Sequence, residues 1–243
     1  MKAWGLTDVG NVREQNQDAF RIVQLGETAL LALVCDGMGG AKSGNVASRL
    51  ASEVFSEEVK RSFSVEMTPE ETERVLRAAA TLANIAVFEH AQLSEEFSGM
   101  GTTLVAALCY EKASLVLNIG DSRAYHINAD GVRCVTVDHS VVELMVQRGE
   151  LTPEQAKSHP SKNLITRAVG TGKQVMADVF RVETAAEDCL LLCSDGLSNQ
   201  MADEEILFEV VHGARKDDCC QRLLEIAKNR GAPDNVTSVL ISL

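Results

Sequence analysis

The sequence lacks the features that mark membrane, secreted and multidomain proteins. Its apolar runs are all far shorter than the roughly 20 residues that cross a bilayer. Residues 1–5 lack the apolar core of a signal peptide. The four prolines are scattered, and no low-complexity tract or internal repeat marks a linker. We therefore expect one domain that spans residues 1–243 and acts in the cytoplasm, without a membrane partner.

Paired cysteines and positive charge are also scarce. The seven cysteines include no Cys-x-x-Cys pair, and most lie in apolar segments. Reduced thiols in a core have this distribution, so we expect neither a disulfide framework nor a zinc site. The chain has 23 Lys and Arg against 35 Asp and Glu, a formal net charge of −12. This excess of negative charge argues against nucleic acid as a partner.

What the sequence does contain is a set of acidic residues at the ends of apolar strands. Residues 29–35 form an unbroken apolar run, which predicts a strand buried on both faces. It leads into Val34-Cys35-Asp36-Gly37-Met38-Gly39-Gly40, where glycines allow close approach of the backbone to a ligand. A single Asp-Gly after a strand is usually only a turn. The same construction recurs, however, at Gly120-Asp121-Ser122-Arg123, at Ser194-Asp195-Gly196 and at Pro233-Asp234-Asn235.

One compact domain can bring these four acidic residues together. Crowded carboxylates repel one another, so they either take up protons or hold cations. No paired His or Cys lies near them in the sequence. The ligand set therefore favours a hard, oxygen-binding ion such as Mg²⁺ or Mn²⁺ over zinc.

A polar loop near the N-terminus supplies two further candidates. It connects short strands expected at residues 3–7 and 19–23. Arg13 in this loop is either a solvated surface cation or a clamp for phosphate, because guanidinium presents a planar fork of donors. Asp18 adds another carboxylate to the predicted cluster.

The remaining pattern predicts helices outside stacked sheets. Helices are expected at residues 43–61, from Thr68-Pro69 to about residue 90, at 203–211 and at 217–230. Strands are expected at residues 104–109, 114–119, 123–127, 132–137, 178–183, 188–193 and 236–241. The middle strands follow one another too closely for crossover helices, so they must pair antiparallel. Two early helices, a β region and two late helices predict an α+β fold with sheets stacked face to face.

Residues 138–172 are less regular. Short helical pieces are expected at residues 141–147 and from Thr152-Pro153, and residues 144–172 have the irregularity of a mobile segment near a site. Asp138, His139 and Ser140 have the residue types of a catalytic triad. Consecutive residues cannot point at one another in that way, so we reject a triad here.

Taken in order, these motifs resemble the metal-dependent protein serine/threonine phosphatases of type 2C, the PPM family. The resemblance covers essentially the whole chain, and its compact length and Asp-Gly-Met-Gly-Gly form resemble the bacterial single-domain members. Its ordered pieces are Arg13 with Asn16-Gln17-Asp18, residues 34–40, Gly101-Thr102-Thr103, residues 120–123, Leu164-Ile165-Thr166-Arg167-Ala168-Val169-Gly170, residues 194–196 and Asp234-Asn235.

The resemblance implies a four-layer α-β-β-α sandwich, with two antiparallel sheets between helix pairs and a metal centre at one end. By the resemblance, Asp36 bridges two Mn²⁺ or Mg²⁺ ions. The Gly37 carbonyl joins one of these ions, and Asp195 and Asp234 join the other.

The family pattern also implies roles for the remaining candidates. Asp18 holds metal-bound water, Arg13 binds the substrate phosphate, and Asp121 with Asp195 holds a weaker third ion. Arg13, Asp18 and Asp36 are thus the expected catalytic residues. Residues 144–172 resemble the flap beside the site.

The implied activity is hydrolysis of phosphoserine and phosphothreonine in proteins by a water that bridges the two ions. Expected partners are phosphorylated proteins and a serine/threonine kinase with its substrates, and we expect a monomer. Two positions depart from the family. Gln17 stands where many members have Glu, and Met38 stands where eukaryotic members often have His, proposed there as a general acid. Because Met cannot donate a proton, the leaving group must take its proton from a metal-bound water or from elsewhere.

Two other readings stay open. One is a binding protein that keeps the fold without turnover, and the other is a metallohydrolase for small phosphate esters. The presence of all the matched carboxylates argues against the first, since one lost ligand usually marks such proteins.

Overall fold

The central strand β3 (Leu30–Met38) shows how the layers are built. The structure is a computed structural model that describes residues 1–39, 43–213 and 215–243. Leu31, Leu33 and Cys35 belong to the core beneath the first helix pair, whereas Leu30, Ala32 and Val34 belong to the core between the sheets. Because successive side chains point to opposite faces, one apolar run supplies two cores. The strand is buried on both faces, as its sequence predicts.

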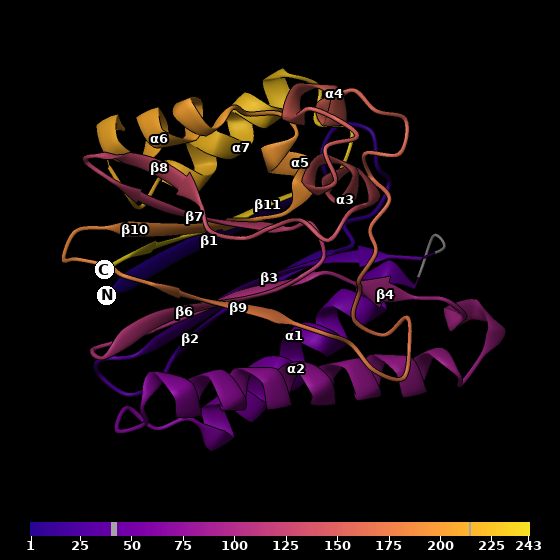
Figure 1. Cartoon of the computed structure of the whole chain (residues 1–243), viewed down its shortest axis with the longest axis horizontal. Coiled ribbons are helices and arrows are strands. Elements are labelled where there is room, and N and C mark those ends of the chain that lie inside the picture. The colour runs from indigo at the N-terminus through magenta and orange to yellow at the C-terminus, as the bar shows by residue number, and fades with distance from the viewer. Residues whose placement is uncertain (40–42, 214) are drawn as a thin grey trace.

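Two antiparallel sheets stack face to face (Figure 1). The first has the order β2 (Asp18–Gln24), β3, β5 (Leu104–Tyr110), β6 (Ala113–Ile119) and β9 (Asp178–Val182), and β4 (Gly101–Thr102) pairs with β3. The second has the order β1 (Lys2–Asp8), β11 (Val236–Ser242), β10 (Cys189–Cys193), β7 (Arg123–Asn128) and β8 (Gly131–Cys134). Their facing side chains form the middle of the molecule.

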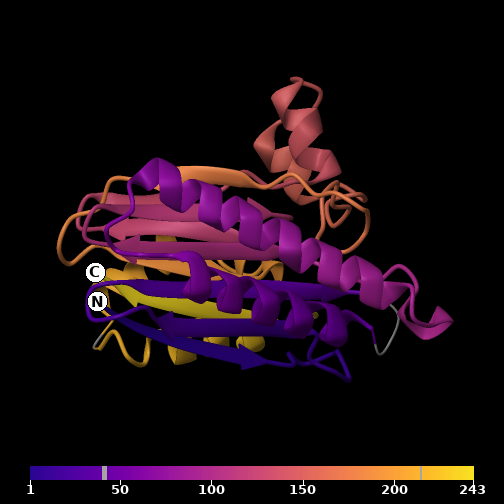
Figure 2. The ribbon, with the colours of Figure 1, turned by 90° about the horizontal axis from the view of Figure 1, so that it is seen from below.

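Helices cover the outer face of each sheet. Helices α1 (Gly44–Ser62) and α2 (Pro69–Ala91) lie across the first sheet, as Figure 2 shows from below. Helices α6 (Asp203–His212) and α7 (Cys219–Asn229) cover the second. Helix α2 begins at the expected capping box, in which Thr68 and Glu71 each accept a hydrogen bond from the other's backbone N–H. The predicted α+β arrangement of two sheets between helix pairs is confirmed.

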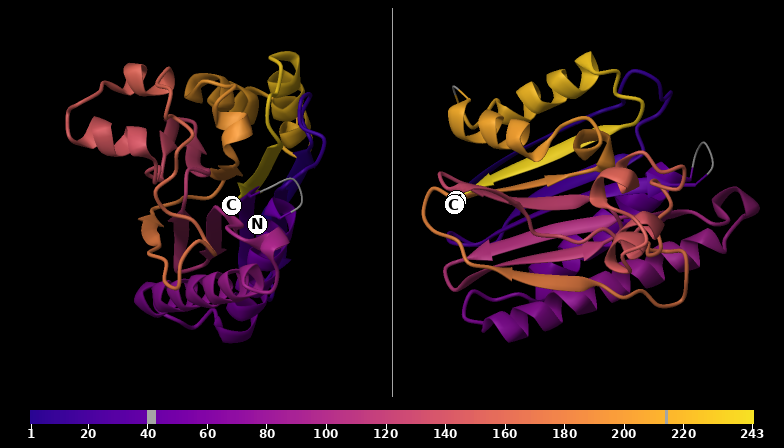
Figure 3. Two further views of the ribbon diagram at one scale, coloured as in Figure 1. Left: turned by 90° about the vertical axis from the view of Figure 1, so that its right-hand side faces the viewer. Right: turned by 45° about the horizontal axis from the view of Figure 1, so that its top comes forward.

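A small projecting part interrupts the sandwich. Helices α3 (Val141–Gln147) and α4 (Pro153–Lys157) stand away from the sheets in Figure 3, left. The base of this projecting part is closed by two backbone hydrogen bonds, from Val141 N to Leu164 O (2.8 Å) and from Thr166 N to His139 O (2.7 Å). Two further short helical elements are α5 (Asp195–Ser198) and the 3₁₀ turn η1 (Glu95–Phe97).

Some expected boundaries are wrong. The strand expected at residues 132–137 ends at Cys134, because the Thr136 hydroxyl accepts from Ala124 N (3.2 Å) in place of a backbone carbonyl. Helix α7 begins at Cys219, two residues later than expected, and neither α5 nor η1 was expected. Gly40, which ends the Asp-Gly-Met-Gly-Gly motif, lies outside the described residues.

The structure also describes the cysteines and the apolar character of the helices. All seven cysteines are free, and all but Cys134 are buried, as expected for reduced core thiols. In the described ranges, no helix combines the length and the apolar character that a membrane span requires.

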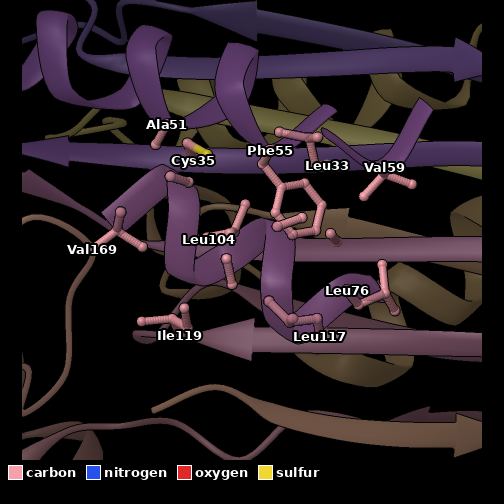
Figure 4. Packing of buried hydrophobic residues seen from close by; sticks show 14 of the residues in the cluster. Leu33, Cys35, Ala51, Phe55, Val59, Leu76, Leu104, Leu117, Ile119 and Val169 are labelled. Atoms are coloured by element: carbon pink, nitrogen blue, oxygen red, sulfur yellow. The ribbon is translucent and has the colours of Figure 1, made fainter. Parts of the chain in front are cut away.

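The core beneath α1 and α2 yields a test of the packing. Phe55 is fully buried among Leu33, Leu76 and Leu104 (Figure 4). We expect Phe55→Ala to lower the free energy of unfolding by about 3–5 kcal/mol, because the cavity cannot collapse fully. Urea unfolding measures this. The control is Phe208→Ala on α6, where the native ring is 59% exposed, with an expected change within about 0.5 kcal/mol. Equal losses in the two variants would contradict the assignment of this core.

Candidate active site

The acidic residues meet where strand ends from both sheets come together. Asp18 on β2 lies directly opposite Asp36 on β3 in the strand register. Both belong to the strand faces that pack between the sheets, since they alternate in step with Phe20 and Val34. From the second sheet, Asp195 follows β10 and Asp234 precedes β11. The site is therefore a continuation of the inter-sheet layer.

A cavity of about 570 Å³ opens at this end. The sequence-predicted residues that line it are Arg13, Asp36, Gly37, Asp121, Asp195 and Asp234. Asp18 is not among the lining residues and is 9% exposed. The structure thus brings the candidates to one place, with Asp18 beneath the others.

Threonine and serine hydroxyls hold the backbone around Asp36. Its N–H donates to Thr103 Oγ1 (2.9 Å), and its carbonyl accepts from Thr103 N (2.9 Å) and Thr102 Oγ1 (2.8 Å). Thr103 Oγ1 in turn lies 2.7 Å from Ser122 Oγ, beside Asp121. The backbone of β3 and the turn that carries Asp121 are therefore fixed to one another.

Asp18 presents one satisfied and one unsatisfied oxygen. Its Oδ2 accepts hydrogen bonds from Ser194 Oγ (2.7 Å) and Thr237 Oγ1 (2.6 Å). Its Oδ1 is buried without a hydrogen-bond partner among the described residues, and so is Oδ1 of Asp195. Buried polar atoms nearly always have partners, so these two oxygens suit a cation or the water that a cation binds.

Burial and mutual repulsion raise the pKa values of the carboxyl groups. Burial raises the pKa of Asp18 to about 7, and the charges of Asp195 and Asp234 add to the effect. Burial, with the charge of Asp195, likewise raises the pKa of Asp121 to about 7. The pKa of Asp36 is raised well above its ordinary value by burial and by the charge of Asp18, and burial with the charge of Asp234 raises that of Asp195. A divalent cation would relieve this repulsion.

Arg13 lies at this cluster rather than free in solvent. Its Nη2 donates to Asp234 Oδ2 at 2.8 Å, although 56% of its side chain is exposed. The guanidinium has five N–H donors, so donors remain for a phosphate that enters the cavity.

The donor chemistry fits Mg²⁺ or Mn²⁺ ions that keep part of their water shell. Within the described part of the chain, no group of three or more Asp, Glu, His or Cys side chains is arranged to hold an ion. These hard ions keep several water ligands, so fewer protein ligands are needed at each. Gly37 leaves no room for a side chain, because a Cβ there would lie 2.1 Å from Gly44 O.

Sequence reasoning assigned no role to several residues that build the site. Ser194 and Thr237 orient Asp18, and Thr103 holds Asp36. Asn235 was quoted in the Asp234-Asn235 motif, but its hydrogen bonds to a loop more than two hundred residues away were not foreseen. In the sequence, Ser194 and Asn235 are notable only because they stand next to Asp195 and Asp234.

The rejection of a triad at residues 138–140 is confirmed. Asp138 pairs with Arg123, whose Nη2 donates to Asp138 Oδ2 at 2.7 Å. The ring of His139 instead accepts from Gly120 N at Nδ1 (3.1 Å), and its Nε2 lies 2.9 Å from Asp178 Oδ2. Because Nδ1 accepts, a neutral ring carries its proton on Nε2 and donates it to Asp178.

Known proteins resemble this chain over nearly its whole length. Residues 11–237 match the family described as Protein phosphatase 2C. The chain is 35% identical over 236 residues to the serine/threonine phosphatase stp of Listeria innocua, covering 97% of this chain and 93% of that one. The crystal structure of serine/threonine phosphatase Stp1 from Staphylococcus aureus superposes with a TM-score of 0.89 at 38% identity, covering 100% of this chain and 94% of that one.

A second similar structure contains metal. It is the catalytic domain of the serine threonine protein phosphatase PstP in complex with two manganese ions. It superposes with a TM-score of 0.84 at 33% identity and covers 98% of this chain and 96% of that one.

The raised pKa of Asp18 predicts a pH-dependent stability in chelator. Its pKa is about 7 in the folded protein and about 3.9 in an unfolded chain, so the carboxylate destabilises the fold increasingly from about pH 4 to 7 and fully above that. Asn in its place can still accept from both hydroxyls. In EDTA at pH 8 we therefore expect Asp18→Asn to raise the melting temperature by about 2–4 °C or more, and by less at pH 5.

Thermal melts in EDTA at both pH values measure this effect. The control is Asp130→Asn in an exposed turn, for which no change is expected. A lower melting temperature for Asp18→Asn than for the native protein at pH 8 would show that the charge of Asp18 is not destabilising.

Proposed function

This chain belongs to the protein phosphatase 2C family and is a serine/threonine phosphatase, and we propose that it hydrolyses phosphoserine and phosphothreonine with two bound Mn²⁺ or Mg²⁺ ions. The observation that carries the proposal is the meeting of Asp36, Asp195 and Asp234 with Arg13 at one cavity. Two manganese ions in the similar PstP catalytic domain support the number and the kind of ion.

The proposed ligand set uses oxygen atoms from both sheets. Asp36 would be shared by the two ions, the Gly37 carbonyl would hold one of them, and Asp195 and Asp234 would hold the other. When bound, the ions would lower the pKa of a water between them to supply the nucleophile and would neutralise the phosphoryl oxygens. No Ser or Cys nucleophile is required.

Asp18 is proposed to act through water. Its Oδ2 is occupied by two hydroxyl donors, and its unpartnered Oδ1 remains to accept from a water molecule. The two hydroxyls prevent the carboxylate from rotating, so that oxygen has a defined direction. Asp18 would thereby orient water rather than bind an ion directly.

Arg13 is proposed to bind the substrate phosphate while it stays anchored to Asp234. The one hydrogen bond to Asp234 orients the guanidinium, and its remaining donors can contact two phosphate oxygens. Met38 also lines the cavity but cannot donate a proton. We therefore assign protonation of the leaving group to water.

Asp121 is proposed to hold a weaker third ion together with Asp195. Both line the cavity, and the charge of Asp195 contributes to the raised pKa of Asp121. Asp121 lies on the turn after β6 rather than on β3, β10 or β11. A cation held mainly by this turn would leave the central pair of ions intact when it departs.

The proposed domain organisation is a single catalytic domain over residues 1–243, with residues 144–172 as a flap. Asn163 and Ile165 from this region line the cavity, which supports a flap beside the proposed phosphate position. We propose that the substrates are phosphorylated proteins, that a serine/threonine kinase supplies them, and that the enzyme is a monomer.

Metal removal tests the proposed centre. A phosphothreonine peptide should be hydrolysed in Mn²⁺ or Mg²⁺ and not after dialysis against EDTA, and free phosphothreonine should be a poorer substrate. Mn²⁺ should stabilise the native protein by about 2.7 kcal/mol at a hundredfold excess over Kd, and Asp36→Asn should lose most of this stabilisation together with activity. Phosphate release and thermal melts give the two readouts. Full activity after chelation would contradict the two-metal proposal.

A variant of Arg13 tests the phosphate contact. We expect Arg13→Ala to raise KM about tenfold, with a smaller effect on kcat, because a contact made to the phosphate in both ground and transition states is lost. The control is Arg181→Ala on β9, which removes a surface pair with Glu70 away from the cavity. Steady-state kinetics on a phosphothreonine peptide measure KM and kcat for both variants. An unchanged KM would show that Arg13 does not bind the phosphate and is only a surface cation.

A further inference from the structure

The side chain of Asn235 binds three backbone groups of the loop between β1 and β2. Its Nδ2 donates to Val9 O (2.9 Å) and Gln15 O (3.0 Å), and its Oδ1 accepts from Gln17 N (2.8 Å). The residue is 4% exposed. Both amide protons and the amide carbonyl are therefore used on one loop, although Asn235 lies far along the chain, directly before the last strand.

This loop carries Arg13 between its anchored points. Val9 lies on one side of Arg13 and Gln15 on the other, so the amide closes the base of the loop beneath the arginine. A second anchor is Asn11, whose N–H donates to Ala232 O (2.9 Å) and whose Nδ2 donates to Lys228 O (2.8 Å). Figure 3, right, shows the indigo loop beside the C-terminal end of α7.

The loop backbone also lies directly against the segment from Ala232 to Asp234, just before β11. A Cβ on Gly10 would lie 2.2 Å from Asp234 O, and the φ of Gly10 is +77°. Only glycine allows this approach without strain. The position of the loop is thus set relative to a proposed metal ligand.

We propose that Asn235 is a positioning residue for phosphate binding, which acts by holding the loop so that Arg13 reaches the cavity. This inference rests on the proposed role of Arg13. An exposed arginine on an unanchored loop would have to lose loop and side-chain freedom whenever phosphate binds. Anchoring of the loop removes part of that loss beforehand.

The chemistry explains why the residue is asparagine. A primary amide supplies two donors and an acceptor in one plane, which the three loop groups require. Aspartate would place a carboxylate oxygen against two carbonyl oxygens, and alanine would leave three backbone groups without their partner. The link to Asp234 is separate, because Asp234 Oδ1 accepts from the backbone N–H of Asn235 (2.9 Å), which substitution of the side chain retains.

A double-mutant cycle tests the inference. Asn235→Ala, Arg13→Ala and the double variant are compared for kcat and KM on a phosphothreonine peptide at saturating Mn²⁺. We expect Asn235→Ala to raise KM about tenfold with a smaller change in kcat. We expect the double variant to have the KM of Arg13→Ala alone, because both changes remove the same contact. The Kd for Mn²⁺, measured by thermal titration, should stay within about twofold.

Asp188→Ala is the matched control. Asp188 is also a buried side chain that anchors a loop, and it does not line the cavity: its Oδ2 accepts from Ala185 N (2.9 Å) and lies 2.7 Å from His126 Nε2. We expect this variant to lower the melting temperature without raising KM. If Asn235→Ala does not fold, Asn11→Ala serves instead, because it removes the Nδ2 donation to Lys228 O, the second anchor of the same loop.

Three results would overturn the inference. One is an unchanged KM in Asn235→Ala while Arg13→Ala raises it, which leaves the phosphate role of Arg13 intact. Another is a double variant whose KM rises by the product of the two single increases, because that result would show that the two changes act independently. The third is a weakened Kd for Mn²⁺ that accounts for the lost activity. If Arg13→Ala itself leaves KM unchanged, the proposed role of Arg13 is wrong and the inference falls with it.

Discussion

The burial of several carboxylates at one end of a closed β-sandwich is the constraint on which the rest of the structure depends. Asp18, Asp36 and Asp195 are poorly solvated and near one another. The charge of Asp195 therefore raises the pKa of Asp18, and the charges of Asp18 and Asp195 raise that of Asp36, beyond what burial alone does. A fold that needed only stability would place apolar residues there. The persistent repulsion is the physical reason to infer a divalent cation as part of the working protein.

Neutral hydrogen-bonding groups keep these charges in place. Thr103 holds the backbone of Asp36, and Ser194 and Thr237 hold one oxygen of Asp18. Asp18 and Asp36 lie in the first sheet, whereas Ser194 and Thr237 belong to the second sheet and its β10 end. The site is therefore assembled only when the two sheets are packed, which couples the core between them to the chemistry at its edge.

The loop with Arg13, at the entrance of the cavity, is also held by neutral hydrogen-bonding groups. It contains no helix or strand, and several of its backbone groups are satisfied by Asn235 and by Ala232, shortly after the end of α7. Binding groups on loops need such support, because a loop without it would sample many positions. The result is an exposed arginine on a loop with a defined base.

Patterns between near neighbours made most of the fold predictable. The run before Asp36 predicted a strand buried on both faces, and the Thr68-Pro69 start predicted α2, because propensity, capping and periodicity act over a few residues. The same patterns marked Asp36, Asp121, Asp195 and Asp234 as strand-end carboxylates. The sequence by itself thus determined the elements and the chemical type of the site. What only the tertiary structure decided is the pairing of groups far apart in the chain: Asp18 with Thr237, 219 residues away, and Asn235 with Val9, 226 residues away. These pairings follow from the strand order, with β1 beside β11 and β2 opposite β3, and no local pattern encodes which strand ends will meet.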